Sequence, residues 1–186
     1  MSDLTNDRPA SGFTLPDGDL WIFGYGSLMW RPGFEHVEQH RAMLPGRHRR
    51  LCVWSWYHRG LQHAPGLVMG LDRGGSCIGS AFRVPAREAP GAFEYLAARE
   101  MVTPVYRPSR VTLRLQDGRR VDGVTFTVDR TNPQYAGRLT VETAADTVRR
   151  SEGHSGHNAD YVRETVAQLR RMAVRDPFLE AVAAAL

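Results

Sequence analysis

Strand-like segments with one inserted helix occupy the first two thirds of this 186-residue chain, and helix-like segments occupy the last third. The apolar run Leu20–Phe23 is short enough for a buried strand, and further strand-like segments span residues 49–57, 66–71 and 77–84. A doubly wound parallel sheet would need strands and helices in regular alternation, which this order does not provide. The order therefore predicts an α+β fold in which a curved or barrel-like antiparallel sheet carries helices on its outside.

Two glycine-containing segments have the composition of hairpin turns. Residues 72–76, Asp-Arg-Gly-Gly-Ser, would join the last two of the strands above. Asp117-Gly118 would turn the chain between Val111–Leu115 and Val121–Val128. Both turns favour antiparallel pairing of sequential strands.

A helix with one apolar face is predicted to begin near Pro90, because proline is favoured in a first helical turn. Phe93, Leu96, Ala97 and Glu100 then follow at i, i+3, i+4 and i+7. A carboxylate on an apolar face is costly unless it finds a partner or its pKa rises through desolvation. Glu100 is therefore either part of a buried ion pair or a group suited to proton transfer near neutral pH.

The C-terminal third is predicted to form three helices. Thr140 can cap the first, and Gly153 is expected to stop it. Asn158 can cap the second. The apolar stripe of this second helix comprises Val162, Val166, Leu169 and either Met172 or Ala173. Asp176-Pro177 opens a short third helix.

The length and the 42% hydrophobic composition fit one folded domain. We expect residues 1–18 to be a flexible N-terminal tail and residues 19–186 to form a single domain. No apolar run approaches the roughly 20 residues needed to cross a bilayer, and residues 1–15 lack the architecture of a signal peptide. The sequence thus predicts a cytoplasmic protein that does not contact membranes.

The net charge of +4 comes almost entirely from arginine, which mildly favours an anionic ligand. The cluster Arg47–Arg50 runs directly into the apolar residues 51–54, so we interpret it as the solvated start of a strand. Nucleic-acid binding is accordingly not predicted. Cys52 and Cys77 belong to no CxxC pair, and we expect both to be buried free thiols.

The first apolar run ends in a tight glycine-rich loop, Gly24–Leu28. A dinucleotide-binding motif would require a glycine where Met29 stands. Small residues in such a loop can point consecutive backbone N–H groups at one anion, such as a carboxylate, although a plain strand-to-loop turn is the alternative. Ser27 has no GxSxG context and no evident base, so a nucleophilic role is not predicted. His154 and His157 lack a third ligand, and neither a metal nor another cofactor is expected.

Ordered motifs run from about residue 20 to about residue 180. They comprise Phe23–Trp30 (FGYGSLMW), Trp54–Gly60, Pro65–Val68, Gly74–Cys77, Arg99–Thr103, Val105–Pro108, Asn132–Gly137 and Gly156–Tyr161. Together they resemble the ChaC branch of the γ-glutamylcyclotransferases, the branch specific for glutathione. No single motif decides the resemblance, but ordered matches over most of the chain make chance similarity improbable.

The resemblance implies a small mixed or antiparallel β-barrel with peripheral helices, in which residues 19–186 form one catalytic domain. Backbone amides of the glycine-rich loop would hold the γ-glutamyl group, and Glu100 would be the catalytic acid and base. The substrate-binding residues would be Tyr25, Gly26, Ser27, Leu28, Tyr106 and Tyr135. Two positions depart from the family pattern: Pro104 stands where glycine is usual, which could alter how Tyr106 is presented, and Leu61 stands where threonine is common.

A γ-glutamyl amide can be cleaved without a nucleophile from the protein, because its free α-amino group can attack its own side-chain carbonyl and close a five-membered ring. The implied reaction converts glutathione, a small-molecule substrate, into 5-oxoproline and cysteinylglycine without an obligate protein partner. Two alternatives remain open. One is a cyclotransferase for other γ-glutamyl amino acids or amines. The other is a catalytically silent γ-glutamyl-binding regulatory module, against which the presence of Glu100 argues.

Overall fold

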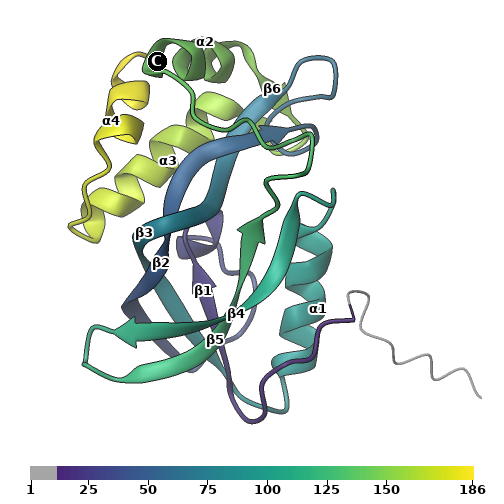
Figure 1. Cartoon of the computed structure of the whole chain (residues 1–186), viewed down its shortest axis with the longest axis vertical. Coiled ribbons are helices and arrows are strands. Elements are labelled where there is room, and N and C mark those ends of the chain that lie inside the picture. Colours follow the sequence, from purple (N-terminus) through teal and green to yellow (C-terminus); the bar gives the residue numbers. More distant parts are fainter. Residues whose placement is uncertain (1–11) are drawn as a thin grey trace, which may run out of the picture.

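A computed structural model describes residues 12–186, which form a closed barrel with helices on its outside (Figure 1). The five strands are β1 (Leu20–Gly24), β2 (Glu38–Ser55), β3 (Gly66–Val84), β4 (Tyr106–Leu115) and β5 (Arg120–Val128). Their order around the barrel is β1-β3-β2-β4-β5. β1 pairs with β3 in antiparallel and with β5 in parallel orientation. The barrel is therefore mixed, and the predicted α+β barrel with peripheral helices is confirmed.

β2 and β3 form one long antiparallel ribbon, and here one prediction was wrong. Residues 72–76 are not a hairpin turn but a bulge within β3. The pairs Pro45–Ser76 and Arg47–Arg73 enclose two residues of β3, Gly74 and Gly75, opposite one residue of β2. Both glycines have positive φ, 93° and 66°, which suits a bulge as well as a turn. The bulge lets the ribbon continue beyond the barrel toward the C-terminal helices (Figure 1).

The second predicted hairpin is confirmed, because β4 and β5 pair in antiparallel orientation across residues 117–118. The predicted helix that follows β3 is also present as α1 (Ala89–Glu100). Phe93 and Leu96 are buried against the barrel, and Pro90 lies in the first turn. Glu100 is the last residue of α1, so the helix places its carboxylate at the end of the barrel that carries the glycine-rich loop.

Three helices lie beside the projecting part of the ribbon: α2 (Val141–Arg150), α3 (Asn158–Arg171) and α4 (Pro177–Ala184). Short elements complete the chain: the 3₁₀ helix η1 (Ser27–Met29) and the strands β6 (Glu152–Gly153) and β7 (Gly156–His157). Thr140 caps α2 as predicted, accepting the backbone N–H of Thr143. α4 begins at Pro177, as predicted, and the Asp176 side chain caps it by accepting the backbone N–H of Leu179. The apolar stripe of α3 is buried at Val162, Val166 and Leu169.

Two predicted helix boundaries, at Gly153 and Asn158, were wrong. In both cases the residue contacts a distant part of the chain instead of ending or capping a helix. α2 already ends at Arg150, and Gly153 instead packs its backbone against the loop after β2, where a Cβ would lie 2.5 Å from the carbonyl oxygen of Tyr57. Asn158 is the first residue of α3, and its cap is His157. The Asn158 amide group exchanges two hydrogen bonds of 2.7 Å with the backbone of Leu67, so it docks α3 onto β3.

Cys52 and Cys77 are buried free thiols, as predicted. Burial raises the pKa of Cys52 to about 12, so this thiol is not ionised near neutral pH. No helix within residues 12–186 is long and apolar enough to cross a membrane.

Most of the predicted N-terminal tail, residues 1–11, lies outside the described residues. Just after that stretch, the Phe13 ring stacks on Phe93 of α1, with centroids 5.5 Å apart. Arg110 donates to the carbonyl oxygens of Thr14 and Leu15. These contacts connect residues 13–15 to α1 and to Arg110.

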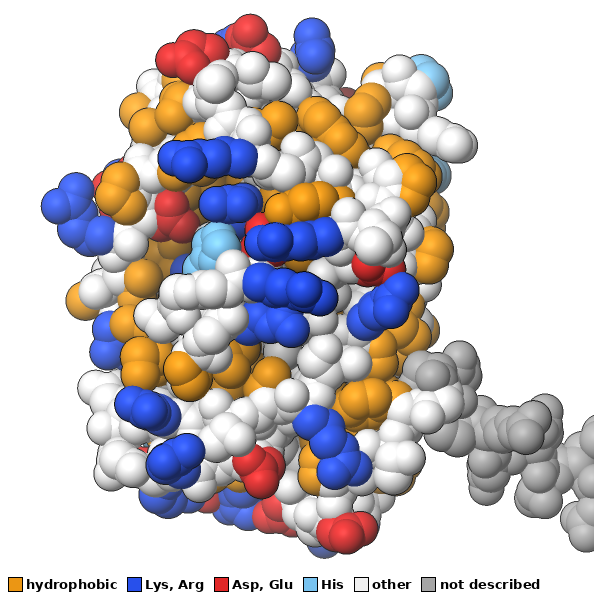
Figure 2. Space-filling model, in the orientation of Figure 1, with side chains coloured by type: hydrophobic (Ala, Val, Ile, Leu, Met, Phe, Trp, Pro, Cys, Tyr) orange, Lys and Arg blue, Asp and Glu red, His pale blue; other side chains and the backbone are white. Residues whose placement is uncertain are grey.

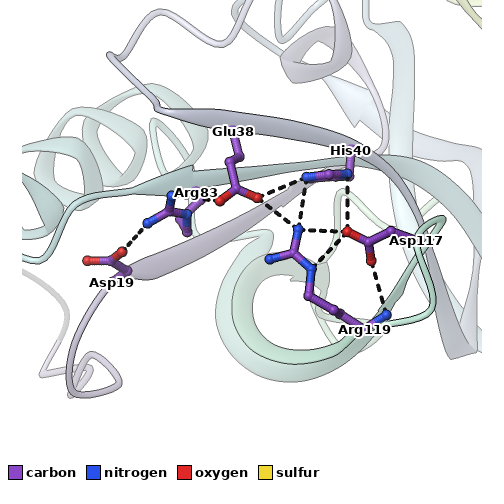
Figure 3. Close-up of polar contacts among 6 residues, drawn as sticks. All are labelled: Asp19, Glu38, His40, Arg83, Asp117 and Arg119. Carbon is purple, nitrogen blue, oxygen red and sulfur yellow. Dashed lines mark hydrogen bonds and ion pairs between the residues drawn. The ribbon is translucent and has the colours of Figure 1, made fainter.

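A network of charged side chains ties the start of β2 to β3 and to the β4–β5 turn (Figure 3). Its members are Asp19, Glu38, His40, Arg83, Asp117 and Arg119. The Glu38 carboxylate accepts from Arg119 at 2.8 Å and pairs with Arg83 at 2.6 Å. Hydrogen bonds with Arg119, His40 and Arg83, in decreasing order of effect, lower the pKa of Glu38 to about 2. Its contribution to stability is present above the ordinary pKa of 4.5 and is lost only as the pH falls toward 2.

Candidate active site

One cavity of about 370 Å³ opens where the glycine-rich loop, the end of α1 and the start of α3 meet. Its volume lies within the roughly 300–1,000 Å³ typical of small-molecule sites. The walls include six of the predicted site residues: Tyr25, Gly26, Ser27, Leu28, Glu100 and Tyr106. The structure thus brings together residues from three separate parts of the sequence.

The loop presents free backbone donors to this cavity. The carbonyl oxygens of Gly26 and Ser27 accept from the amides of Met29 and Trp30, at 3.0 and 3.2 Å. The amides of Gly26, Ser27 and Leu28 themselves have no acceptor in the described part of the chain. A Cβ on Gly26 would lie 3.2 Å from the hydroxyl of Tyr161, so a side chain would crowd the space beside these amides. Consecutive unpaired N–H groups of this kind form an anion-binding concavity.

Arg49 of β2 fixes the loop from behind. Its Nε donates to the carbonyl oxygen of Tyr25 at 2.6 Å, and its Nη2 donates to that of Ile78 at 2.7 Å. The guanidinium group therefore ties the loop to β3. These two hydrogen bonds hold the glycine-rich loop against β3. The local sequence around Tyr25 does not predict them, because Arg49 is distant in sequence.

The carboxylate of Glu100 lies in the cavity wall with its side chain 19% exposed. Burial raises its pKa above the ordinary value, and the nearby charge of Arg99 opposes that rise. The Arg99 contact is a loose one, with Nε and Oε1 3.6 Å apart, and it is the only polar contact of the Glu100 side chain within residues 12–186. Glu100 is thus not held in a tight structural ion pair. Its carboxylate remains available for proton exchange.

Arg99 instead connects α1 to the loop region. Its Nη2 donates to the hydroxyl of Ser27 at 2.9 Å, and its Nη1 donates to the carbonyl oxygen of Arg31 at 2.6 Å. These bonds set the distance between the two sides of the cavity, the loop amides and the Glu100 carboxylate. Arg99 therefore acts as a positioning residue.

Three tyrosine side chains surround the carboxylate. Tyr25 donates to the carbonyl oxygen of Phe126 at 2.8 Å, and Tyr106 donates to that of Met69 at 2.6 Å. The hydroxyl of Tyr161 accepts the amide of Met69 at 3.0 Å. Burial raises the pKa of all three hydroxyl groups, so they stay protonated. They shape a neutral wall and leave Glu100 as the titrating group among them.

Known proteins resemble this chain in sequence over most of its length. A family model described as ChaC-like protein matches residues 20–186. The chain belongs to the ChaC-like family. Among curated ChaC-like relatives, the glutathione-specific γ-glutamylcyclotransferase of Escherichia coli is 35% identical over 160 residues, covering 86% of this chain and 69% of that protein. The human glutathione-specific γ-glutamylcyclotransferase 1 is 35% identical over 161 residues, covering 83% and 72%.

A solved structure shares the ChaC-like fold. It is a γ-glutamyl cyclotransferase specific to glutathione from yeast, with a TM-score of 0.82 and 21% sequence identity. The match covers 91% of this chain and 96% of that one. At this level of identity the likeness concerns the fold, and it includes the barrel together with its helices.

One expected substrate contact of this ChaC-like chain does not reach the cavity. Tyr135 lies in the segment after β5, where it forms a bridge with Val53. Its hydroxyl donates to Asp72 at 2.8 Å, away from the cavity lining. Tyr106, by contrast, reaches the cavity although Pro104 stands two residues before it. Leu61, the other departure, forms a small bridge with Ala64.

Several cavity residues were not singled out from the sequence. They include Trp30, Arg31, His58, Arg59, Tyr95, Tyr161 and Glu164. His58 and Arg59 come from the loop after β2, and Tyr161 and Glu164 come from α3. Trp30 lies in the motif segment Phe23–Trp30, and the segments Trp54–Gly60 and Gly156–Tyr161 include His58, Arg59 and Tyr161. Within residues 12–186, no group of three His, Cys, Asp or Glu side chains converges in a metal-binding arrangement.

Proposed function

We propose that this protein is a γ-glutamylcyclotransferase that cleaves glutathione into 5-oxoproline and cysteinylglycine, and that it works in the cytoplasm. The observation that carries the proposal is the pairing of an elevated-pKa carboxylate with unpaired loop amides in one cavity. The amides suit the α-carboxylate of a γ-glutamyl group, and Glu100 suits proton transfer at the adjacent α-nitrogen. The names of the curated relatives agree with this substrate.

The reaction needs one bond to form and one to break. Glu100 removes a proton from the α-ammonium group, and the resulting amine attacks the γ-carbonyl carbon to close the five-membered ring. The carbon–nitrogen bond to cysteine then breaks as Glu100 delivers a proton to the departing nitrogen. Overall the α-nitrogen loses two protons and the departing nitrogen gains two, so Glu100 ends the cycle ionised. The loop amides hold the glutamyl chain near its attack geometry, which is an orientation effect.

Purified protein incubated with glutathione alone tests the proposal, with products followed by mass spectrometry. Equal amounts of 5-oxoproline and cysteinylglycine, formed without added metal or nucleotide, are expected. Turnover of other γ-glutamyl amino acids or amines, without turnover of glutathione, would instead identify a cyclotransferase of different substrate range. If the protein turned over no γ-glutamyl compound, the result would favour a γ-glutamyl-binding module without catalytic activity.

The raised pKa of Glu100 predicts the acidic limb of the pH profile. The carboxylate must be ionised to remove the first proton, so kcat/KM should fall as the pH drops through its pKa. Since burial raises that pKa, the limb should lie above the ordinary value of 4.5. Steady-state rates measured from roughly pH 4 to roughly pH 8, a range that begins near the ordinary pKa of a Glu carboxyl group, locate this limb. A limb at or below 4.5 would contradict the assignment.

Replacing Tyr106 by phenylalanine should lower kcat/KM by a few-fold, up to about 10-fold. The change removes the hydrogen bond to the carbonyl oxygen of Met69, a loss of about 0.5–1.5 kcal/mol, and loosens the cavity wall. Tyr135→Phe is the matched comparison, because its hydroxyl contacts Asp72 outside the cavity. Steady-state kinetics should show the larger effect for Tyr106→Phe. The reverse order would favour Tyr135 as the substrate contact.

A further inference from the structure

Arg59 is a cation in the cavity wall that lacks an anionic partner. Only 8% of the residue is exposed. Its Nη1 donates to the carbonyl oxygen of His157 at 3.0 Å, and its Cζ lies 5.6 Å from the centre of the Tyr161 ring. Neither contact supplies a negative charge. In the part of the chain that the structure describes, no carboxylate forms an ion pair with Arg59.

An unpaired buried charge is unfavourable, and proteins normally compensate for it with a counter-ion. Burial lowers the pKa of Arg59, as expected for an incompletely compensated cation. Glu164 lines the same cavity but is too far away to form an ion pair. Among the described residues, the buried side-chain nitrogens that lack a hydrogen-bond partner are Nε of Arg41 and Nε of Arg83. No nitrogen of Arg59 is both buried and without a partner. The remaining guanidinium nitrogens of Arg59 therefore open onto the cavity.

The backbone around Arg59 is rigidly supported. Its amide donates to the hydroxyl of Ser55 at 2.9 Å. Gly60 and Gly66 pack backbone against backbone, so closely that a Cβ on either would overlap the opposite strand of the loop. A guanidinium group on such a support is preorganised, and binding to it costs little ordering entropy.

The other cavity cations are less suited to a ligand carboxylate. Arg99 already uses its guanidinium group on Ser27 and on the carbonyl oxygen of Arg31. Arg31 itself is exposed, so water can solvate its charge. Arg59 alone among the three combines burial with free donors.

We propose that Arg59 binds the carboxylate at the far end of the substrate's leaving group, which in glutathione is the carboxylate of glycine. This inference rests on the proposed function, in which the loop amides and Glu100 engage the γ-glutamyl end. A planar carboxylate matches the guanidinium fork and can accept two hydrogen bonds from it. Arg59 would thereby select a γ-glutamyl peptide with a terminal carboxylate over other γ-glutamyl amides.

Glutathione and its glycine monoethyl ester test this selection, because the ester removes the charge without changing the scissile bond. For the unmodified protein, kcat/KM should be about 10–100-fold higher for glutathione, the range of a charge-assisted hydrogen bond. Arg59→Met should lower kcat/KM for glutathione by a similar factor, mainly through KM, and should leave the rate with the ester nearly unchanged. Arg163→Met, which removes an exposed arginine of α3 outside the cavity, is the matched control.

Arg59→Gln guards against a folding defect, since glutamine can still donate to the carbonyl oxygen of His157. It should also lose the preference for glutathione. Equal use of both substrates by the unmodified protein would overturn the inference even if every Arg59 variant unfolded. An equal loss on both substrates in a folded variant would overturn it too. Failure of the unmodified protein to cleave glutathione at all would instead refute the proposed function.

Discussion

Replacing Glu100 by glutamine is expected to lower kcat for glutathione cleavage by about 10²–10⁴-fold, the usual contribution of general acid–base catalysis. Glutamine has nearly the same shape but cannot take a proton from the α-ammonium group. The fold should survive, because the side chain makes a single loose contact, 3.6 Å to Arg99, within the described chain. Arg99 keeps its bonds to Ser27 and Arg31 in the variant.

Glu94→Gln provides the matched control for this change. Glu94 lies on the same helix but on its exposed side, so the variant loses the same charge away from the cavity. Steady-state kinetics should show near-normal turnover for Glu94→Gln and severe loss for Glu100→Gln. Folded Glu100→Gln protein that cleaves glutathione at the normal rate would eliminate Glu100 as the acid and base.

The largest effect on stability is expected from Asp72→Asn. The Asp72 side chain is completely buried and accepts from Arg130 at 2.6 Å, Arg50 at 3.2 Å and Tyr135 at 2.8 Å. Figure 2 shows basic side chains gathered on one face of the molecule. Asp72 is the buried counter-charge for two arginines, Arg50 and Arg130. Removing one partner of a buried pair costs about 3–5 kcal/mol. Since both arginines remain partly solvated, we expect a loss near the lower limit, about 3 kcal/mol.

The pH dependence of this loss follows from the pKa of Asp72. Burial alone would raise that pKa, but the hydrogen bonds from Arg130, the Arg73 amide and Tyr135 outweigh it and hold the pKa below the ordinary 3.8. The stabilisation is therefore present above pH 3.8 and disappears as the pH falls through the lower native value.

Urea unfolding at pH 7 and in acid measures both effects. The difference between the two proteins should be large at neutral pH and should shrink in acid. Asp146→Asn, which breaks an exposed pair with Arg149, should change stability by less than about 1 kcal/mol. Equal stability of the Asp72→Asn and unmodified proteins at pH 7 would show that the buried network contributes nothing.

Features set by local chemistry could be predicted from the sequence. The periodicity of α1 placed Phe93, Leu96 and Glu100 on one apolar face, because helical spacing alone determines which residues share a face. Thr140 was identified as a cap because a cap bonds to an amide only three residues away. Asp176-Pro177 was identified as a helix start because proline suits the first helical turn.

Features set by distant partners could not be predicted. Asn158 has the composition of a helix cap, yet its amide group is used on Leu67, 91 residues away in sequence. Gly74 and Gly75 adopt positive φ in a bulge, and only the partner strand distinguishes a bulge from a hairpin turn. Arg59 belongs to the site because α3 packs against the loop after β2, which no local pattern reveals.

The central claim is that the substrate's own amine, and not water, attacks the γ-carbonyl carbon. Running the reaction with glutathione in ¹⁸O-labelled water tests it most directly, with mass spectrometry of the glutamyl product. We predict 5-oxoproline that carries no ¹⁸O, formed in step with cysteinylglycine and without glutamate. Glutamate that has gained one ¹⁸O atom would show that water is the nucleophile and would contradict the account.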